Sequence, residues 1–308
     1  MPSRSIKRIV EAKPTMEGAG VKLRRAFGFG DTGQTDPFLL LDDFRNDNPA
    51  DYRKGFPWHP HRGIETITYV LAGTVEHGDS LGNRGAMGAG DVQWMTAGSG
   101  ILHQEMPKGD EAGRMHGFQL WANLSASLKM TAPRYQDVKA AQIPEVVDDD
   151  GTRVRVVVGD FWGKKGPVEG VAADPIYLDV FVPPGKRKTF PVAHERNAFA
   201  YVFEGSGTFR DASGPRGVLT EKGSDHTGIA RETTGNRSLV LFDSGDEVTV
   251  QAGDGGIRFL LVSGKPLKEP VAWYGPIVMN TQDELRTAVA ELQNGSFIKG
   301  NGRPAARA

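Results

Sequence analysis

Residues 65–73, Glu-Thr-Ile-Thr-Tyr-Val-Leu-Ala-Gly, form a β-branched and aromatic run that stops at a glycine. This composition predicts a short strand followed by a turn. A second run of the same kind, Ala-Phe-Ala-Tyr-Val-Phe-Glu-Gly, covers residues 198–205. Its Tyr-Val-x-x-Gly pattern lies 132 residues after that of the first run. The repeat indicates two similar strand-rich units.

A second pair of matching turns follows in the same order. Gly90-Asp91 and the glycine-rich residues 97–100 match Gly245-Asp246 and residues 252–255, now 155 residues apart. Two matches in one order favour a duplication, with an insertion in the second copy. The chain has 40 glycines, about twice the usual share, and a duplicated strand-and-turn fold accounts for them.

Helical periodicity is concentrated near the end of the chain. Thr281-Gln-Asp-Glu284 forms a capping box, and Gly295 is a typical C-terminal stop. The apolar face between them consists of Leu285, Ala288, Val289 and Leu292. We therefore expect an all-β protein of two barrels with one short helix at 281–294. A Gly/Pro/Lys-rich stretch at 163–170 suggests domains at 1–165 and 166–308.

Composition excludes several classes of function. The 308 residues carry 37 Lys and Arg against 38 Asp and Glu. Near-neutral charge gives no footprint for nucleic acid or an anionic membrane. The absence of cysteine rules out disulfides, thiolate metal sites and thiol nucleophiles. Any metal must be held by imidazole and carboxylate groups.

Neither a leader nor a membrane span is evident in the sequence. Residues 1–18 carry charges that interrupt any apolar core of a signal peptide. The longest apolar runs are far shorter than the roughly 18 residues that a spanning helix requires. We expect a soluble, cytoplasmic protein, and a monomer.

Two histidine pairs stand out. His59-Pro-His61 follows an aromatic segment, and His103-Gln-Glu105 follows a glycine-rich turn. Residues two apart in a strand share a face, so each pair can point into a barrel. Three imidazoles and one carboxylate would leave open positions on a metal with five or six ligands.

Alternatives remain at each position. A lone histidine is more often a hydrogen-bonded core or surface residue than a ligand, although two spaced pairs reverse that preference. Glu65 is a rival carboxylate, and a bulge at Gly63 would decide which face it takes. In the second copy the four candidate ligands correspond to Pro191, Ala193, Arg258 and Leu260. The first copy is thus the metal-binding one and the second a scaffold.

The sequence resembles the pirin family of the cupin superfamily over nearly its whole length. The motifs that carry the resemblance are Gly55-Phe-Pro-Trp-His-Pro-His-Arg-Gly-Ile-Glu-Thr66, the segment from Gly90 to Met106, Gly117-Phe-Gln-Leu-Trp-Ala-Asn-Leu124, Asn197–Gly205 and Glu269–Asn280. The resemblance implies two cupin barrels, or jelly rolls, packed face to face, with one metal in the first. Its ligands would be His59, His61, His103 and Glu105, with Glu65 beside them.

Family membership would imply one of two functions. The first is an iron-dependent dioxygenase of quercetin 2,3-dioxygenase type, which cleaves a flavonol with O2 and releases CO. Glu105 would be its base and Glu65 the substitute, while manganese, nickel, copper, zinc or cobalt could replace iron. The second is a non-enzymatic, metal-binding regulatory partner of a transcription factor or metabolic enzyme. A cupin sugar isomerase is a weaker third option.

A flat aromatic substrate would need an apolar pocket. Phe56, Trp58 and Trp94 lie close in sequence to the ligand segments and are candidate walls. The alternative is that they belong to the barrel core, where aromatic residues are common.

Overall fold

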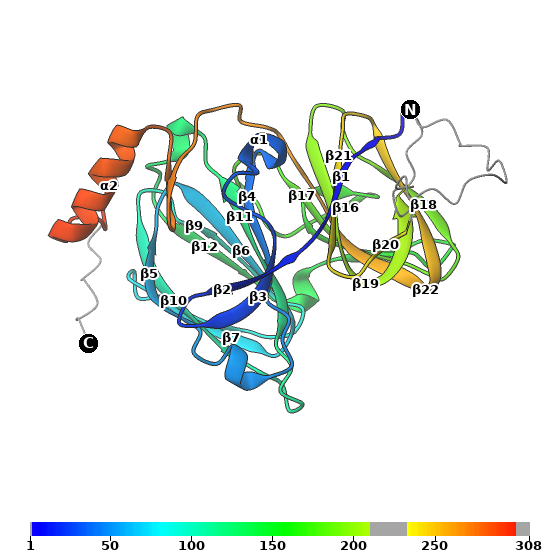
Figure 1. Cartoon of the computed structure of the whole chain (residues 1–308), viewed down its shortest axis with the longest axis horizontal. Helices are drawn as coiled ribbons and strands as arrows, with labels where there is room; N and C mark the ends of the chain where they lie inside the picture. The colour runs from blue at the N-terminus through cyan, green and yellow to red at the C-terminus, as the bar shows by residue number, and fades with distance from the viewer. Residues whose placement is uncertain (1, 210–232, 300–308) are drawn as a thin grey trace, which may run out of the picture.

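The structure, a computed structural model, describes residues 2–209 and 233–299. Strands dominate it, and they form two barrels side by side (Figure 1). The first barrel lies at the left of the view and the second at the right, while the C-terminal helix packs at the far end of the first. The all-β expectation with a short terminal helix is confirmed.

The first barrel is formed by two antiparallel sheets. In spatial order, the seven-stranded sheet contains β12 (Arg134–Val138), β9 (Val92–Thr96), β6 (Ile64–Ala72), β11 (His116–Asn123), β4 (Phe38–Asp43), β3 (Val21–Phe27) and β2 (Lys13–Glu17). The four-stranded sheet contains β5 (Phe56–His61), β10 (Ile101–Lys108), β7 (Thr74–Asp79) and β8 (Arg84–Met87). Side chains alternate along β6: Ile67 and Tyr69 join the core shared with the second barrel, whereas Thr68 faces the interior of the first.

One continuous sheet forms most of the second barrel. Its main path contains β1 (Ile6–Glu11), β21 (Ser238–Phe242), β19 (Asn197–Phe209), β22 (Glu247–Gly264), β17 (Ile176–Val182), β14 (Arg153–Val158) and β13 (Glu145–Val147). To this path β18 (Arg187–Pro191) and β20 (Thr234–Gly235) are added at β22 and β19. The interior is filled by apolar side chains, among them Val180, Phe190, Val250 and Phe259.

The remaining elements are short. They are the hairpins β15 (Asp160–Phe161) with β16 (Lys164–Lys165) and β23 (Ala272–Tyr274) with β24 (Ile277–Met279), the helices α1 (Thr32–Thr35) and α2 (Gln282–Asn294), and 3₁₀ turns at Pro49–Asp51, Ala126–Leu128 and Ala140–Gln142. The predicted helix is confirmed as α2. Thr281 caps its N-terminus through a capping box with Glu284, and Gly295 ends it in the left-handed conformation with φ of 79°.

The assignment of strands to the two barrels does not follow the predicted domain boundary at residue 165. Strands β13 and β14 precede that boundary yet lie in the sheet of the second barrel, and the N-terminal strand β1 pairs with β21 there. In the other direction, β24 returns to the first barrel, where Ile277 forms a bridge with Arg62. The glycine-rich stretch that suggested the boundary includes the turn of the β15–β16 hairpin, so its turn residues reflect a local hairpin.

The two barrels pack face to face through a reciprocal pair of hydrogen bonds. The Tyr69 hydroxyl of the first barrel donates to Asp179 of the second at 2.7 Å, and the Tyr201 hydroxyl of the second donates to Asp43 of the first at 2.8 Å. Both tyrosines are fully buried in the shared core. The repeated tyrosine therefore belongs to the interface between the barrels.

One correspondence drawn from the repeat was wrong. Leu260 stands opposite Tyr201 in the β19–β22 ladder, as Phe118 stands opposite Tyr69 between β6 and β11. Leu260 is therefore the counterpart of Phe118 and not of Glu105, and Arg258 is an ion-pair partner of Asp179 at 2.7 Å. Glycine-rich turns recur so often in this chain that a matching turn did not fix the register of the strand after it.

Candidate metal centre and cavity

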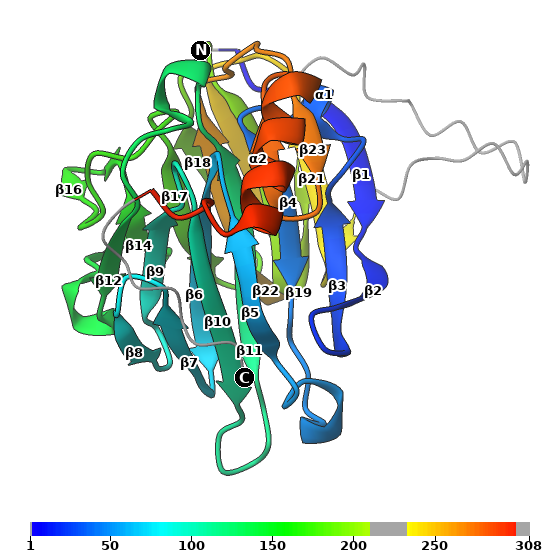
Figure 2. The same ribbon diagram turned by 90° about the vertical axis from the view of Figure 1, so that its left-hand side faces the viewer.

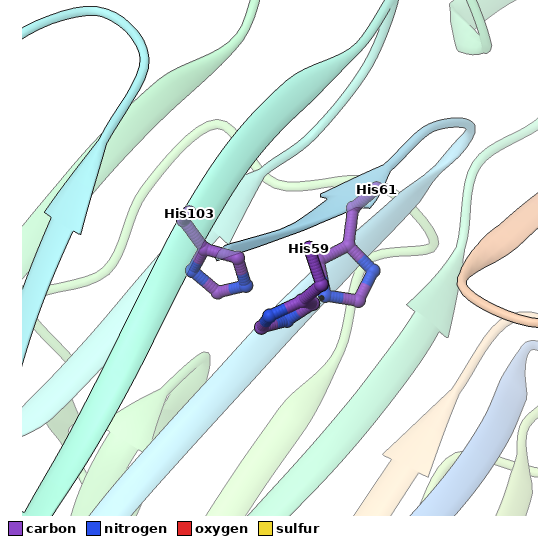
Figure 3. Close-up of side chains that lie close together, drawn as sticks. All are labelled: His59, His61 and His103. Atoms are coloured by element: carbon purple, nitrogen blue, oxygen red, sulfur yellow. Dashed lines mark hydrogen bonds between the residues drawn. The ribbon is translucent and has the colours of Figure 1, made fainter. Parts of the chain in front are cut away.

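Three histidine side chains converge inside the first barrel (Figure 3). His59 and His61 project from β5, and His103 projects from the neighbouring strand β10, where it stands opposite His59. One ring nitrogen from each lies within 4.8 Å of the others. They form the only such cluster of histidine or acidic groups in the described part of the chain. The structure thus brings together three of the four predicted ligands.

Hydrogen bonds fix which nitrogens of His59 and His61 face each other. Nδ1 of His59 lies 2.9 Å from the Pro57 carbonyl, and Nδ1 of His61 lies 3.2 Å from the Pro276 carbonyl. A carbonyl only accepts, so each Nδ1 carries the proton and each Nε2 presents a lone pair. The two Nε2 atoms are 3.1 Å apart. Two lone pairs at this distance repel each other unless a cation lies beside both.

The donor set fits a metal ion. Two nitrogens that each lie about 2.1 Å from a metal, at right angles, are about 3.0 Å apart, close to the observed separation. His103 is 1% exposed, and neither of its ring nitrogens has a hydrogen-bond partner among the described residues. Buried polar atoms without partners are rare. A metal held by His59, His61 and His103 would take up one ring nitrogen of His103 and the two facing lone pairs of His59 and His61.

The electrostatics favour neutral imidazoles. Burial lowers the pKa of His59, and it lowers the pKa of His61 and of His103 well below the usual value, helped by the neighbouring imidazoles. Neutral rings keep the lone pairs that a metal requires. The site is therefore available for a metal at neutral pH.

Glu105, the fourth predicted ligand, lies outside the three-histidine cluster. A register irregularity between His103 and Glu105 in the pairing with β5 places Glu105 opposite Phe56. Its Oε1 accepts a hydrogen bond from the Thr68 hydroxyl at 3.0 Å, and burial raises its pKa to about 7. Glu105 lines the same cavity as His59 and His61, as a buried carboxyl group beside the imidazoles.

Glu65 points away from this site. Gly63, with φ of 77°, forms the turn between β5 and β6, so the parity of side chains is not continuous from His61 to Glu65. The Glu65 carboxylate accepts hydrogen bonds from the Thr96 hydroxyl at 2.7 Å and the Ala172 amide at 3.2 Å. Burial raises the pKa of Glu65. It does not line the cavity and serves the contact with the second half of the chain.

A cavity of about 700 Å³ opens in front of His59 and His61. Of the aromatic residues predicted to line a pocket, Phe56 and Trp58 do so. Trp94 does not, because its fully buried side chain points from β9 into the core shared by the barrels. Aromatic residues that the sequence reasoning missed complete the wall: Phe29, Phe44, Tyr52, Trp121, Trp273 and Tyr274.

A polar row crosses one wall of the cavity. The Thr68 hydroxyl also lies 2.6 Å from the Gln119 side-chain oxygen, and Gln119 stands opposite Asp42 in the sheet. Asp42 holds Arg25 through two hydrogen bonds of 2.8 and 2.7 Å, and Arg25 also pairs with Glu17 at 2.9 Å. The cavity therefore combines an aromatic and aliphatic lining with a line of hydrogen-bonding groups.

Comparison with known proteins agrees with this architecture. The family model for pirin matches residues 20–122, and the model for the pirin C-terminal cupin domain matches residues 177–298. A pirin-like protein from Caulobacter vibrioides is 43% identical over 298 residues, which span 96% of this chain and 100% of the relative. The chain belongs to the pirin family.

Other pirin-family relatives bear names that refer to an enzyme. A putative quercetin 2,3-dioxygenase from Pseudomonas aeruginosa is 40% identical, covering 92% of this chain and 94% of the relative. The crystal structure of a quercetin 2,3-dioxygenase from Acinetobacter baumannii superposes with a TM-score of 0.83 at 30% identity, covering 96% of this chain and 100% of that one. This pirin-family chain thus shares its two-cupin fold with a structure named as a dioxygenase.

No described helix of the protein is both long and apolar enough to cross a membrane.

Proposed function

We propose that the protein is a metal-dependent dioxygenase of quercetin 2,3-dioxygenase type. It would cleave a flavonol or a similar aromatic enol with O2, giving a depside and CO. The observation that carries the proposal is the position of the three-imidazole cluster, of which His59 and His61 line a largely apolar cavity of about 700 Å³. This volume lies within the range of small-molecule sites.

His59, His61 and His103 would hold the metal, with iron as the first candidate. The chemistry that such a metal supplies when bound is polarisation of an enol oxygen and electron transfer with O2. Imidazole and carboxylate donors accept most first-row divalent ions, so manganese, nickel, copper, zinc and cobalt belong in the same test.

Glu105 would take up the proton of the substrate hydroxyl. It is 7% exposed and lines the cavity beside the imidazoles. Burial raises its pKa to about 7, close to the pH at which a general base is most effective. Thr68 holds one carboxylate oxygen by a hydrogen bond and leaves the other to accept the proton.

The walls suit a flat, hydroxylated ring system. Trp58 and Trp121 line the cavity next to the histidines, and the Trp121 ring lies 5.1 Å from that of His61. Aromatic faces stack well against planar substrates. The Arg25–Asp42 pair and Gln119 offer donors and acceptors to hydroxyls on a ring remote from the metal.

The test is turnover of quercetin by protein loaded separately with each of the six metals. Loss of flavonol absorbance with matching O2 uptake and CO release is expected for at least one metal, and not for the His61→Ala variant. Absence of flavonol loss with every metal would contradict the proposal and favour the regulatory alternative.

The role of Glu105 has its own variant. Glu105→Gln keeps the size and the Thr68 contact but cannot accept the proton, so kcat should fall about 10²–10⁴-fold with metal content retained. Glu65→Gln is the matched control, because Glu65 does not line the cavity. Equal losses in both variants would remove the assignment of Glu105 as the base.

A further inference from the structure

The C-terminal segment, defined here as residues 272–298, contacts the strand that carries two of the metal-site histidines. The backbone amide of Val278 donates to the Arg62 carbonyl at 3.0 Å, and Ile277 forms a parallel bridge with Arg62. Arg62 directly follows His61. Figure 2 shows α2 of this segment lying across the face of the first barrel.

The contact is close enough to require glycine. A Cβ atom at Gly63 would lie 1.9 Å from the Val278 carbonyl oxygen, a distance that no side chain tolerates. Val278 itself packs in an apolar cluster with Ile64, Met95 and Ile101 of the first barrel. The C-terminal segment is thus part of the structure directly behind the turn after His61.

The buried side chain of Arg62 binds the same C-terminal segment. It is 2% exposed, and its guanidinium lies 2.7 Å from the Glu291 carboxylate of α2. It also donates to the Phe297 carbonyl at 2.8 Å and lies 4.1 Å from the centre of the Phe297 ring. A buried guanidinium is stable only with such partners, and loss of one is strongly destabilising. Arg62 therefore connects the ligand strand to both α2 and the residues after it.

The segment also touches a metal-site side chain. The Pro276 carbonyl is the acceptor for Nδ1–H of His61, at 3.2 Å. A partner of this kind fixes the tautomer and ring orientation of a ligating histidine and increases its basicity. The carbonyl is held in place by a hairpin whose anchors are Arg62 and the apolar contacts of Val278.

We propose that Arg62 is a positioning residue of the metal centre. By binding Glu291 and Phe297 it holds the C-terminal segment in place, and the segment holds the Pro276 carbonyl against His61. The affinity for metal then depends on the contacts of Arg62 with Glu291 and Phe297, which lie about 230 residues away in sequence from the ligand strand. The inference concerns metal binding alone, so it stands or fails separately from the dioxygenase proposal.

The test measures Ni²⁺ binding by the metal-free, full-length protein, in competition with a chromophoric chelator. We expect Kd to rise about tenfold in Glu291→Gln and up to about 100-fold in Arg62→Ala. Arg62→Lys should recover part of the affinity, because an ammonium group can still pair with Glu291. The control is Arg286→Gln on the same helix, since Arg286 pairs only with exposed Asp283 among the described residues.

A second measurement separates positioning from general stability. The absorption spectrum of Co²⁺-loaded protein reports the geometry of the metal's ligands, and it should change in Glu291→Gln but not in Arg286→Gln. If Arg62→Ala does not fold, Glu291→Gln and Arg62→Lys decide the outcome. An unchanged Kd together with an unchanged Co²⁺ spectrum in these variants would overturn the proposal, even if their unfolding temperatures fall.

Discussion

The interiors of the two barrels differ more than their strands do. In the first barrel, polar side chains such as His59, His61 and Glu105 line a cavity of about 700 Å³. In the second, residues such as Val180, Phe190 and Phe259 fill the space with apolar atoms. The same barrel architecture thus forms a binding cavity when the inward-facing side chains are polar, and a packed core when they are apolar. The functional information lies in those positions and not in the fold.

The contact between the barrels shows the opposite pattern, because there the halves are alike. Each contributes a buried tyrosine that donates to an aspartate of the other, and each aspartate is also held by an arginine. The duplicated feature that the sequence retains most clearly is therefore structural. The difference between the two interiors and the symmetry of the interface lead to four predictions. They follow in order of the size of the expected effect.

The largest effect should follow removal of one ligand in the first barrel. His61→Ala is expected to reduce bound metal from about one equivalent per chain to none, as measured by elemental analysis after loading and desalting. The matched control is His194→Ala in the second half, where His194 is 61% exposed and beside Asp246. Full metal retention in His61→Ala would show that the histidines of the first barrel do not hold the metal.

Truncation of a phenylalanine in each barrel should cost different amounts of stability. Phe190 is fully buried in the second core, so Phe190→Ala should lower the free energy of unfolding by about 3–5 kcal/mol. Phe56 lines the cavity and is only partly buried, so Phe56→Ala should cost at most about 2 kcal/mol. Denaturant unfolding of the metal-free proteins measures both values. Equal costs would indicate that the first interior is packed as densely as the second.

A buried lysine should make the stability of the first barrel depend on pH. Burial lowers the pKa of Lys129 to about 7, against the opposing effect of Glu269 and Glu284, and its ammonium donates to the Gly63 carbonyl and to Asn123. Between this pKa and that of an unfolded lysine, the unfolded state binds more protons, so stability rises with pH.

The expected gain for the metal-free protein is about 2 kcal/mol between pH 7 and pH 9, measured by denaturant unfolding at each pH. In Lys129→Met this gain should disappear, although the variant is less stable throughout. A slope that persists in Lys129→Met would show that another group is responsible.

The smallest effects are expected at the interface, where the halves are alike. Tyr69→Phe and Tyr201→Phe should each cost about 1 kcal/mol, because Arg258 and Arg45 still pair with the two aspartates. Tyr69→Phe should cost slightly more than Tyr201→Phe, because the Tyr69 hydroxyl also accepts a hydrogen bond from Arg155 at 2.8 Å. Metal content should not change in either variant. A large difference between them would mean that the reciprocal bonds are not equivalent.

Much of the site could be predicted because its signals are local. The His-x-His and His-x-Glu spacings alone place side chains on one face of a strand, and the structure brings the three histidines together. The capping box and Gly295 likewise fixed both ends of α2. Each of these predictions depends on residues a few positions apart.

Other parts of the site could not be predicted, for two physical reasons. Trp94 and Glu65 lie in strands that are buried on both faces, so no alternation of polar and apolar residues shows which face meets the cavity. The Arg25–Asp42 pair and Trp273 reach the cavity through chain topology, from strands near the N-terminus and a hairpin near the C-terminus. Their proximity depends on the whole fold and leaves no local pattern.

The crossing of the chain's two ends has a consequence for protein engineering. Strand β1 forms an edge of the second barrel, while residues 272–298 pack on the first and supply the carbonyl at His61. A fragment ending at residue 165 would keep all three histidines but lose that carbonyl, and the complementary fragment would leave β21 without its partner β1. A chimera that exchanges the first barrel between relatives must therefore include the C-terminal segment. One that exchanges the second barrel must include the N-terminal strand β1.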